Sequence, residues 1–181
     1  MIAKHVRVAA VLVLAAAAVL ATTSSGALAD NDPGALRVHL TGHQEDPLTL
    51  STSGGGSFRI HIDQDAQEVT YRLSYSDLEG SVLQAHIHLG QRAQSGGIMV
   101  FLCSNLGNGP AGTQACPAAP AEITGTIHAA DIIGPAGQGV TAGEFNEFLA
   151  AIRAGVAYVN VHSTKYPGGE IRAQLDHQHD D

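Results

Sequence analysis

Three histidines stand at positions from which a folded β-protein could bind a metal ion. His86 and His88 are separated by one residue in the segment Gln-Ala-His-Ile-His-Leu-Gly at 84–90. Alternate residues of a strand point to the same face of a sheet, so we expect these two imidazoles to lie side by side. His162 ends the segment Tyr-Val-Asn-Val-His at 158–162, which alternates in the same way. Imidazole nitrogens are common ligands of copper and zinc, so the spacing predicts a site for one of these metals if the two strands are neighbours.

Other polar residues fall in phase with these histidines. Gln84 shares their face in the first segment, and Asn160 shares it in the second. Glu170 and Arg172 share the polar face of a third segment, 170–175. Such groups can orient metal-binding imidazoles through hydrogen bonds. The alternative is a polar network on the sheet that holds no metal, with Glu170 paired to Arg172 or to a protonated histidine.

The elements that must position these residues are mostly strands, because apolar and polar side chains alternate along most of the chain from 36 to 175. Stretches rich in Gly and Pro separate the alternating runs. One segment differs: Thr141 and Glu144 have the spacing of a capping box, and helical spacing of apolar residues follows. This pattern predicts a helix over 141–154 that Gly155 ends. The expected strands are 36–40, 58–62, 69–75, 83–89, 98–103, 123–127, 157–161 and 170–175.

Short strands in this number, with one short helix, predict an all-β fold. We expect an antiparallel β-sandwich or a Greek-key barrel. Charged residues make up only 14% of the chain, well below the roughly 25% of an average soluble protein. The composition therefore argues against coiled coils and long helices with many salt bridges.

The first residues have the layout of a secretory signal peptide: Lys4 and Arg7, an apolar run over 8–21, and Ala27-Leu28-Ala29 before the cleavage point. We expect removal of 1–29, which leaves a flexible start at 30–35, one domain over 36–175 and a polar tail at 176–181. The expected location is secreted or periplasmic, without membrane association after cleavage. Retention of 8–21 as a membrane anchor is the alternative, although a spanning helix needs about 20 apolar residues.

Cys103 and Cys116 are the two cysteines of the sequence. In an exported protein such a pair is expected to be oxidised, and the loop between them is rich in Gly and Asn. A two-cysteine metal site is the alternative, which the long spacing and the oxidising compartment disfavour. We therefore expect a disulfide.

The charge balance argues against nucleic acid as a partner. The chain has nine Lys and Arg against 17 Asp and Glu, a net charge of −8. Removal of Lys4 and Arg7 leaves seven bases against 17 acids, or −10. Nucleic-acid binders rely on neutralising phosphates, so a partner of this kind is not expected. No Gly-x-Ser-x-Gly motif occurs and both cysteines are expected to be bonded, so nucleophilic catalysis has no support either. His177 and His179 lie in the tail, where we expect solvated side chains.

Four ordered segments of the sequence resemble the CHRD domain, which is named for chordin and occurs in exported bacterial proteins. They are Leu-Thr-Gly-His-Gln-Glu-Asp-Pro at 40–47, Ala-His-Ile-His-Leu-Gly at 85–90, Tyr-Val-Asn-Val-His-Ser-Thr at 158–164 and Pro-Gly-Gly-Glu-Ile-Arg-Ala-Gln-Leu at 167–175. Two departures are mild: Asp46 stands where the family usually has an apolar residue, and Ala173 where glycine is common. The resemblance spans about 36–175 and implies a sandwich or barrel of immunoglobulin-like or Greek-key character.

The histidine pattern is also similar to the copper site of Cu,Zn superoxide dismutases, so a superoxide-dismutase-like barrel is one form the fold can take. The similarity is partial, because no loop carries the further His and Asp ligands of a zinc site. Fold-level likeness does not carry activity with it.

Two functional hypotheses follow from these observations. The first is an exported CHRD-domain protein that acts as a non-catalytic binding or structural module, with an unidentified extracytoplasmic ligand or protein as its partner. The second is a metalloprotein that binds copper or zinc through His86, His88 and His162 and is open to redox chemistry. Neither hypothesis requires an enzyme.

Overall fold

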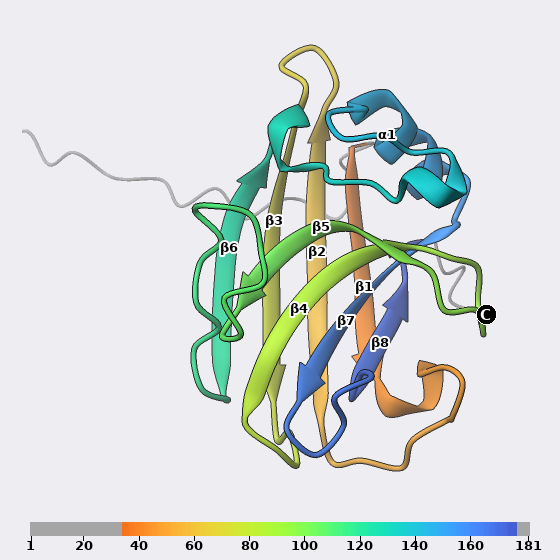
Figure 1. Ribbon diagram of the computed structural model, residues 1–181. Helices are drawn as coiled ribbons and strands as arrows, with labels where there is room; N and C mark the ends of the chain where they lie inside the picture. The colour runs from red at the N-terminus through yellow and green to blue at the C-terminus, as the bar shows by residue number, and fades with distance from the viewer. Residues whose placement is uncertain (1–33, 177–181) are drawn as a thin grey trace, which may run out of the picture.

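The structure is a computed structural model that describes residues 34–176, built of eight antiparallel strands and one short α-helix (Figure 1). All eight strands expected from the alternation are present, each at or within a few residues of its expected bounds. Their bounds are β1 (Ala35–Thr41), β2 (Gly55–Asp63), β3 (Glu68–Ser76), β4 (Val82–Leu89), β5 (Gly97–Ser104), β6 (Ala121–Ile127), β7 (Ala157–Ser163) and β8 (Ile171–Gln174).

The strands form one sheet in the order β5-β4-β7-β8-β1-β2-β3-β6, which curls into a nearly closed barrel. The two ends of the sheet come close to each other: the Tyr71 hydroxyl of β3, the strand next to the edge strand β6, donates a hydrogen bond to the Leu102 carbonyl of the edge strand β5 at 3.1 Å. The sequence left a choice between a sandwich and a barrel, and the structure has the barrel. This order places β7 between β4 and β8, so the three segments with polar faces are adjacent.

The hydrophobic core fills the inside of the barrel. In β1, Leu36, Val38 and Leu40 are buried while the residues between them are exposed, as a strand with one solvated face requires. The strands β4, β7 and β8 differ, since every residue of β7 and β8 and residues 85–88 of β4 are buried, whichever face they point to. Something must therefore cover their outer face as well.

The helix α1 (Phe145–Arg153) packs its buried side chains, among them Phe148 and Ile152, onto one end of the barrel. It begins later than the expected 141, because Thr141 does not cap it. The Glu144 carboxylate instead accepts a hydrogen bond from the Thr141 backbone N–H at 2.6 Å, before the first helical residue. The predicted end is confirmed: Gly155 follows the helix with a φ of 66°, in the left-handed region that glycine tolerates.

The predicted disulfide is confirmed, and it joins Cys103 of β5 to Cys116 in the connection to β6. The Asn105 side chain holds the same connection, since it donates to the Cys116 carbonyl and accepts from the Cys116 N–H, both at 3.0 Å. A disulfide is consistent with an extracytoplasmic location.

The expected signal peptide and most of the expected tail lie outside the described residues. Within 34–176, no helix has the length and apolar character needed to cross a membrane.

Candidate metal centre

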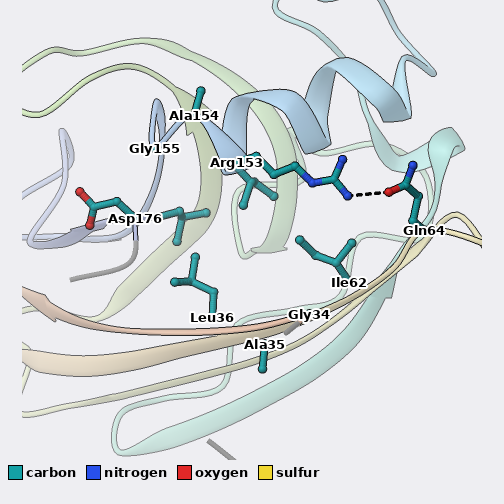
Figure 2. Close-up of a pocket in the computed structure, with 11 residues that line it drawn as sticks. Gly34, Ala35, Leu36, Ile62, Gln64, Arg153, Ala154, Gly155 and Asp176 are labelled. Atoms are coloured by element: carbon teal, nitrogen blue, oxygen red, sulfur yellow. Dashed lines mark hydrogen bonds between the residues drawn. The ribbon is translucent and has the colours of Figure 1, made fainter. Parts of the chain in front are cut away.

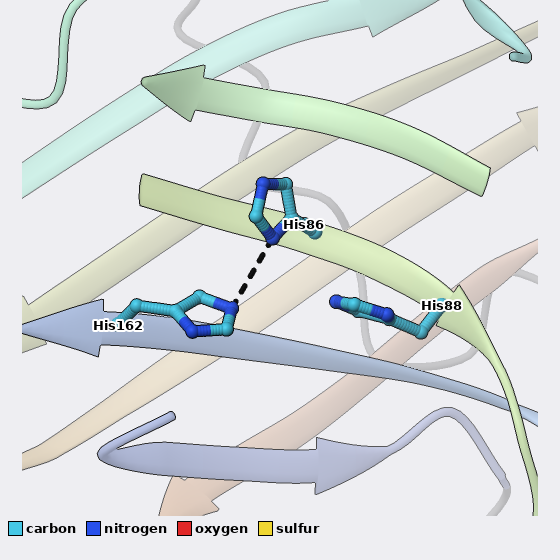
Figure 3. Close-up of side chains that lie close together, drawn as sticks. All are labelled: His86, His88 and His162. Atoms are coloured by element: carbon cyan, nitrogen blue, oxygen red, sulfur yellow. Dashed lines mark hydrogen bonds between the residues drawn. The ribbon is translucent and has the colours of Figure 1, made fainter. Parts of the chain in front are cut away.

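The three histidines lie on the outer face of the barrel, on the neighbouring strands β4 and β7 (Figure 3). Asn160 is the Cα partner of His86, and Gln84 is the partner of His162, so His86 and His162 are diagonal neighbours. Ile87, which stands between His86 and His88 in the sequence, is fully buried in the hydrophobic core. Strict alternation thus brings the imidazoles together on the opposite face.

The imidazoles converge closely enough to share one ion. One nitrogen from each ring lies within 4.8 Å of the other two. His86 Nδ1 and His162 Nε2 lie 3.2 Å apart, a contact drawn as the dashed line in Figure 3. Two nitrogens bound to one zinc ion at about 2.0–2.1 Å in tetrahedral geometry are separated by about 3.3–3.4 Å. One pair therefore already has the separation of two ligands of one ion, and a nitrogen of His88 lies within 4.8 Å of a nitrogen of each of the other two rings.

Main-chain carbonyls fix which nitrogen carries the proton in two of the rings. His88 Nδ1 lies 2.9 Å from the Gly96 carbonyl oxygen, and His162 Nδ1 lies 2.9 Å from that of Pro167. A carbonyl only accepts, so each Nδ1 must donate its proton. The Nε2 of each neutral ring then has a free lone pair, the form in which histidine binds a metal.

Two ring nitrogens in this group are buried without a hydrogen-bond partner among the described residues: His86 Nε2 and His88 Nε2. A buried polar atom left in this way costs about 1–3 kcal/mol. An ion among the rings gives His88 Nε2 a partner, which a hydrogen-bonded network without metal does not. His86 Nε2 does not discriminate between the two, because His86 faces His162 through Nδ1.

The side chain of Asn160 competes for the same His162 nitrogen. Its Oδ1 lies 3.0 Å from His162 Nε2. A neutral imidazole has one N–H, which cannot serve both the Pro167 carbonyl and the Asn160 amide oxygen. The conflict is removed without metal when the amide turns its NH2 group toward Nε2, and with metal when the amide oxygen faces the cation, so this contact fits both accounts.

A short loop between β4 and β5 covers the histidines. Its Gly96 contributes the carbonyl that binds His88, and the Gly96 N–H donates to the Tyr158 hydroxyl at 3.1 Å. The ring of Phe101 closes another side, with its centroid 4.4 Å from that of His86. As a result His86, His88 and His162 expose only 0%, 7% and 6% of their surfaces.

A stack of three planar groups supports His88. Its ring lies parallel to that of Tyr158 at 4.7 Å, with 3° between the planes, and the Arg172 guanidinium lies over the Tyr158 ring at 3.5 Å. Arg172 also donates to the carbonyls of Gln91 and Gln94 at 2.9 and 3.1 Å, which ties the covering loop to β8. Cation–π contact with a desolvated guanidinium contributes about 2 kcal/mol.

Burial keeps all three imidazoles neutral. It lowers the pKa of His86 to about 2, and the closeness of His162 and His88 lowers it further, because two protonated rings would repel each other. It lowers the pKa of His88 to about 4 against the opposing hydrogen bond to Gly96, and nearby Arg172 lowers it further. Burial also lowers the pKa of His162. Neutral imidazole is the ligand form, so no proton has to be removed from a charged ring before a metal binds.

The remaining residues of the predicted polar cluster divide between this site and its surroundings. Asn160 lies within it, and Arg172 reaches it through Tyr158. Gln84 instead accepts a hydrogen bond from Asn108 at 3.0 Å. Glu170 Oε1 accepts from the Thr52 hydroxyl and from the Glu79 N–H, both at 2.7 Å, so this carboxylate turns toward other loops.

Sequence reasoning missed two residues around the site. Tyr158 was placed on the same face as Asn160 and His162 by its phase, but not counted as part of a site. Glu45 had no signal except its place in the first CHRD-like segment. Its carboxyl group is buried beside Gly169, where a Cβ would come within 2.5 Å of Glu45 Oε2. Glycine at 169 is what allows this approach.

Glu45 gives the protein a pH dependence that can be measured. Burial raises its pKa from 4.5 to about 8; Arg172 opposes this rise, and the charges of Asp46 and Glu170 add to it. Because the folded pKa exceeds the unfolded value, the stability that Glu45 contributes is fully present below pH 4.5 and is lost as the pH rises through 8.

The three buried histidines change stability in the opposite direction over this range, so the effect of Glu45 is measured as a difference between two proteins. We therefore expect the wild type to lose about 1 kcal/mol or more of its urea-unfolding free energy relative to Glu45→Gln between pH 5 and pH 8. Glu45→Gln has nearly the same shape and no ionisation at position 45, so it keeps the contribution of the histidines and lacks that of Glu45. Equal pH dependence in the two proteins would contradict the assignment to Glu45.

A separate cavity of about 540 Å³ lies at the end of the barrel where α1 packs (Figure 2). Its walls are partly apolar, with Leu36, Ile62 and Leu175 among them. Arg153 at its edge donates to the Gln64 amide oxygen at 2.7 Å. None of the three histidines lines this cavity.

Comparison with known proteins gives one match. Residues 36–175 match the CHRD domain, the range over which the sequence segments resembled it. No curated protein and no solved structure matches the chain. The geometry of the histidines must therefore be judged from this chain alone.

Proposed function

This chain belongs to the CHRD domain family, and on that premise we propose that it is an extracytoplasmic metal-binding protein with His86, His88 and His162 as ligands. The observation that carries the proposal is the meeting of three buried imidazoles within 4.8 Å, two of which hold their Nδ1 protons on main-chain carbonyls. Each ring can give one lone pair to the ion. Copper and zinc are the metals that such a set of donors suits.

The surroundings support a site built for binding. The loop, Phe101 and the stack on Tyr158 hold the rings in place before any ion arrives, so little ordering is needed on binding. The buried His88 Nε2, which has no partner among the described residues, argues against the alternative of a purely structural polar network.

Metal uptake tests this function directly. Protein without its leader would be dialysed against a chelator, incubated with excess copper or zinc, desalted and analysed for metal content. We expect about one ion per chain, and the same value in a chain that ends at Asp176 and so lacks His177 and His179. Less than about 0.1 ion per chain with both metals would rule the function out, and loss of uptake in the shortened chain would assign the metal to the tail.

The second candidate is a non-catalytic binding or structural module whose partner is an extracytoplasmic ligand or protein. The partly apolar cavity beside α1 favours it, because small-molecule sites are typically concave and largely apolar. The net acidity of the chain makes nucleic acid an unfavourable partner in this case as well. A protein that takes up no metal would leave this candidate as the better account.

A further inference from the structure

The charges around the three histidines bear on which ion they hold. All three donors are neutral, and the buried carboxylate of Glu170 is bonded to Thr52 and the Glu79 backbone. The formal charge closest to His88 through its stack is the cation of Arg172, since Tyr158 of β7 lies between β4 and β8 and contacts both side chains. The site thus offers lone pairs to a metal ion but little negative charge.

The closure of the site has a second consequence. Zinc in proteins is almost always four-coordinate, and a site with three histidines normally adds water or a substrate as the fourth ligand. Here the rings are at least nine-tenths buried, and Phe101 and the 90–96 loop pack over them. The neutral amide of Asn160, 3.0 Å from His162 Nε2, is the one further donor that the described contacts place beside the ligand nitrogens.

Burial in a neutral cage penalises a divalent ion more than a monovalent one. The cost of moving an ion out of water grows with the square of its charge, so a dication pays about four times the penalty of a monocation of similar size. The nearby guanidinium repels the dication twice as strongly. Monovalent copper, a closed-shell ion that accepts two or three nitrogen donors, avoids both the extra charge and the need for a fourth ligand.

We propose that the three histidines form a cuprous-ion site that prefers Cu(I) over Zn(II), and that Arg172 contributes to this preference through its charge. The inference rests on the proposed function, because it concerns which metal the same site binds. Arg172 is a positioning and selectivity residue in this account and does not contact the ion. No electron transfer is involved, since Cu(I) is bound and released without change of oxidation state.

The test compares affinities for two metals in one protein. Cu(I) would be offered without oxygen and with ascorbate, in competition with a coloured Cu(I) chelator, and Zn(II) in competition with a coloured Zn(II) chelator. We expect the wild type to bind Cu(I) at least about 100-fold more tightly than Zn(II). Binding of neither metal would overturn the proposed function itself. Zinc binding as tight as copper binding would overturn this inference alone.

Two variants of Arg172 separate its charge from its shape. Arg172→Gln removes the charge and should lower the ratio of Cu(I) affinity to Zn(II) affinity by about tenfold, mainly through tighter zinc binding. Arg172→Lys keeps the charge but loses the planar stack on Tyr158 and the donation to both loop carbonyls. Its ratio of Cu(I) affinity to Zn(II) affinity should stay within a few-fold of the wild type. An unchanged affinity ratio in Arg172→Gln would show that the charge of Arg172 does not contribute to the preference. If that variant fails to fold, a tenfold lower ratio in Arg172→Lys, which retains the charge, would also show that the charge is not responsible.

Discussion

Replacing His88 with alanine should lower copper affinity by at least about 100-fold while the barrel stays folded. Loss of a residue that merely orients a metal ligand costs 10–100-fold, so loss of a ligand should cost no less than the upper end of that range. His88 is a suitable position because its Nε2 is buried without a partner among the described residues, and its removal leaves no other group unsatisfied there except the Gly96 carbonyl. The measurement is chelator competition under the conditions given above for Cu(I).

The matched control is His39→Ala, which removes an exposed imidazole from β1. It should bind copper within a few-fold of the wild type. His162→Ala should behave like His88→Ala, since its Nε2 faces the same point. Copper binding in His88→Ala that is indistinguishable from the control would show that the ion, if any, lies elsewhere.

Removing the disulfide should lower the free energy of unfolding by a large amount without changing copper binding. The bridge joins residues 13 apart in sequence, and closing a loop of about this size stabilises a protein by roughly 3 kcal/mol through the unfolded state. The Cys103→Ala/Cys116→Ala variant should therefore unfold with a free energy lower by about 3 kcal/mol, measured in urea at fixed pH. Alanine is chosen because both positions are buried and serine would add an unpaired hydroxyl.

Two control measurements accompany the double variant. Reduction of the wild type with a thiol should produce a loss of similar size, which separates the bond from the two sulfur atoms. The double variant should still bind copper within a few-fold, because neither cysteine contacts the histidines in the described contacts. A loss below about 1 kcal/mol would mean that other contacts of the 104–120 connection, such as those of Asn105, already hold it.

Most of the fold could be predicted from the sequence because the barrel strands alternate so regularly. Leu36, Val38 and Leu40 mark β1 by period alone, and the same holds for β2 and β3. The predicted start of the helix was wrong because Thr141 and Glu144 form only one of the two hydrogen bonds of a capping box. The choice between sandwich and barrel depends on the order of strands, which no local pattern encodes.

The site could be predicted as far as its ligands and no further. The phase of His86, His88 and His162 predicted a shared face, and the adjacency of β4 and β7 brings them together. The burial of that face could not be predicted, because it comes from the loop after Leu89 and from Phe101. Contacts of this kind leave no periodic pattern in the sequence. Glu170 had the right phase but is bonded elsewhere, since its nearest donors come from loops distant in sequence.

A crystal structure of copper-loaded protein, with anomalous scattering recorded at the copper edge, tests the central claim most directly. The account predicts one strong anomalous peak per chain at about 2.0–2.2 Å from one nitrogen each of His86, His88 and His162. A peak at any other residues, or no peak among these three rings in crystals of protein shown to contain copper, would contradict it.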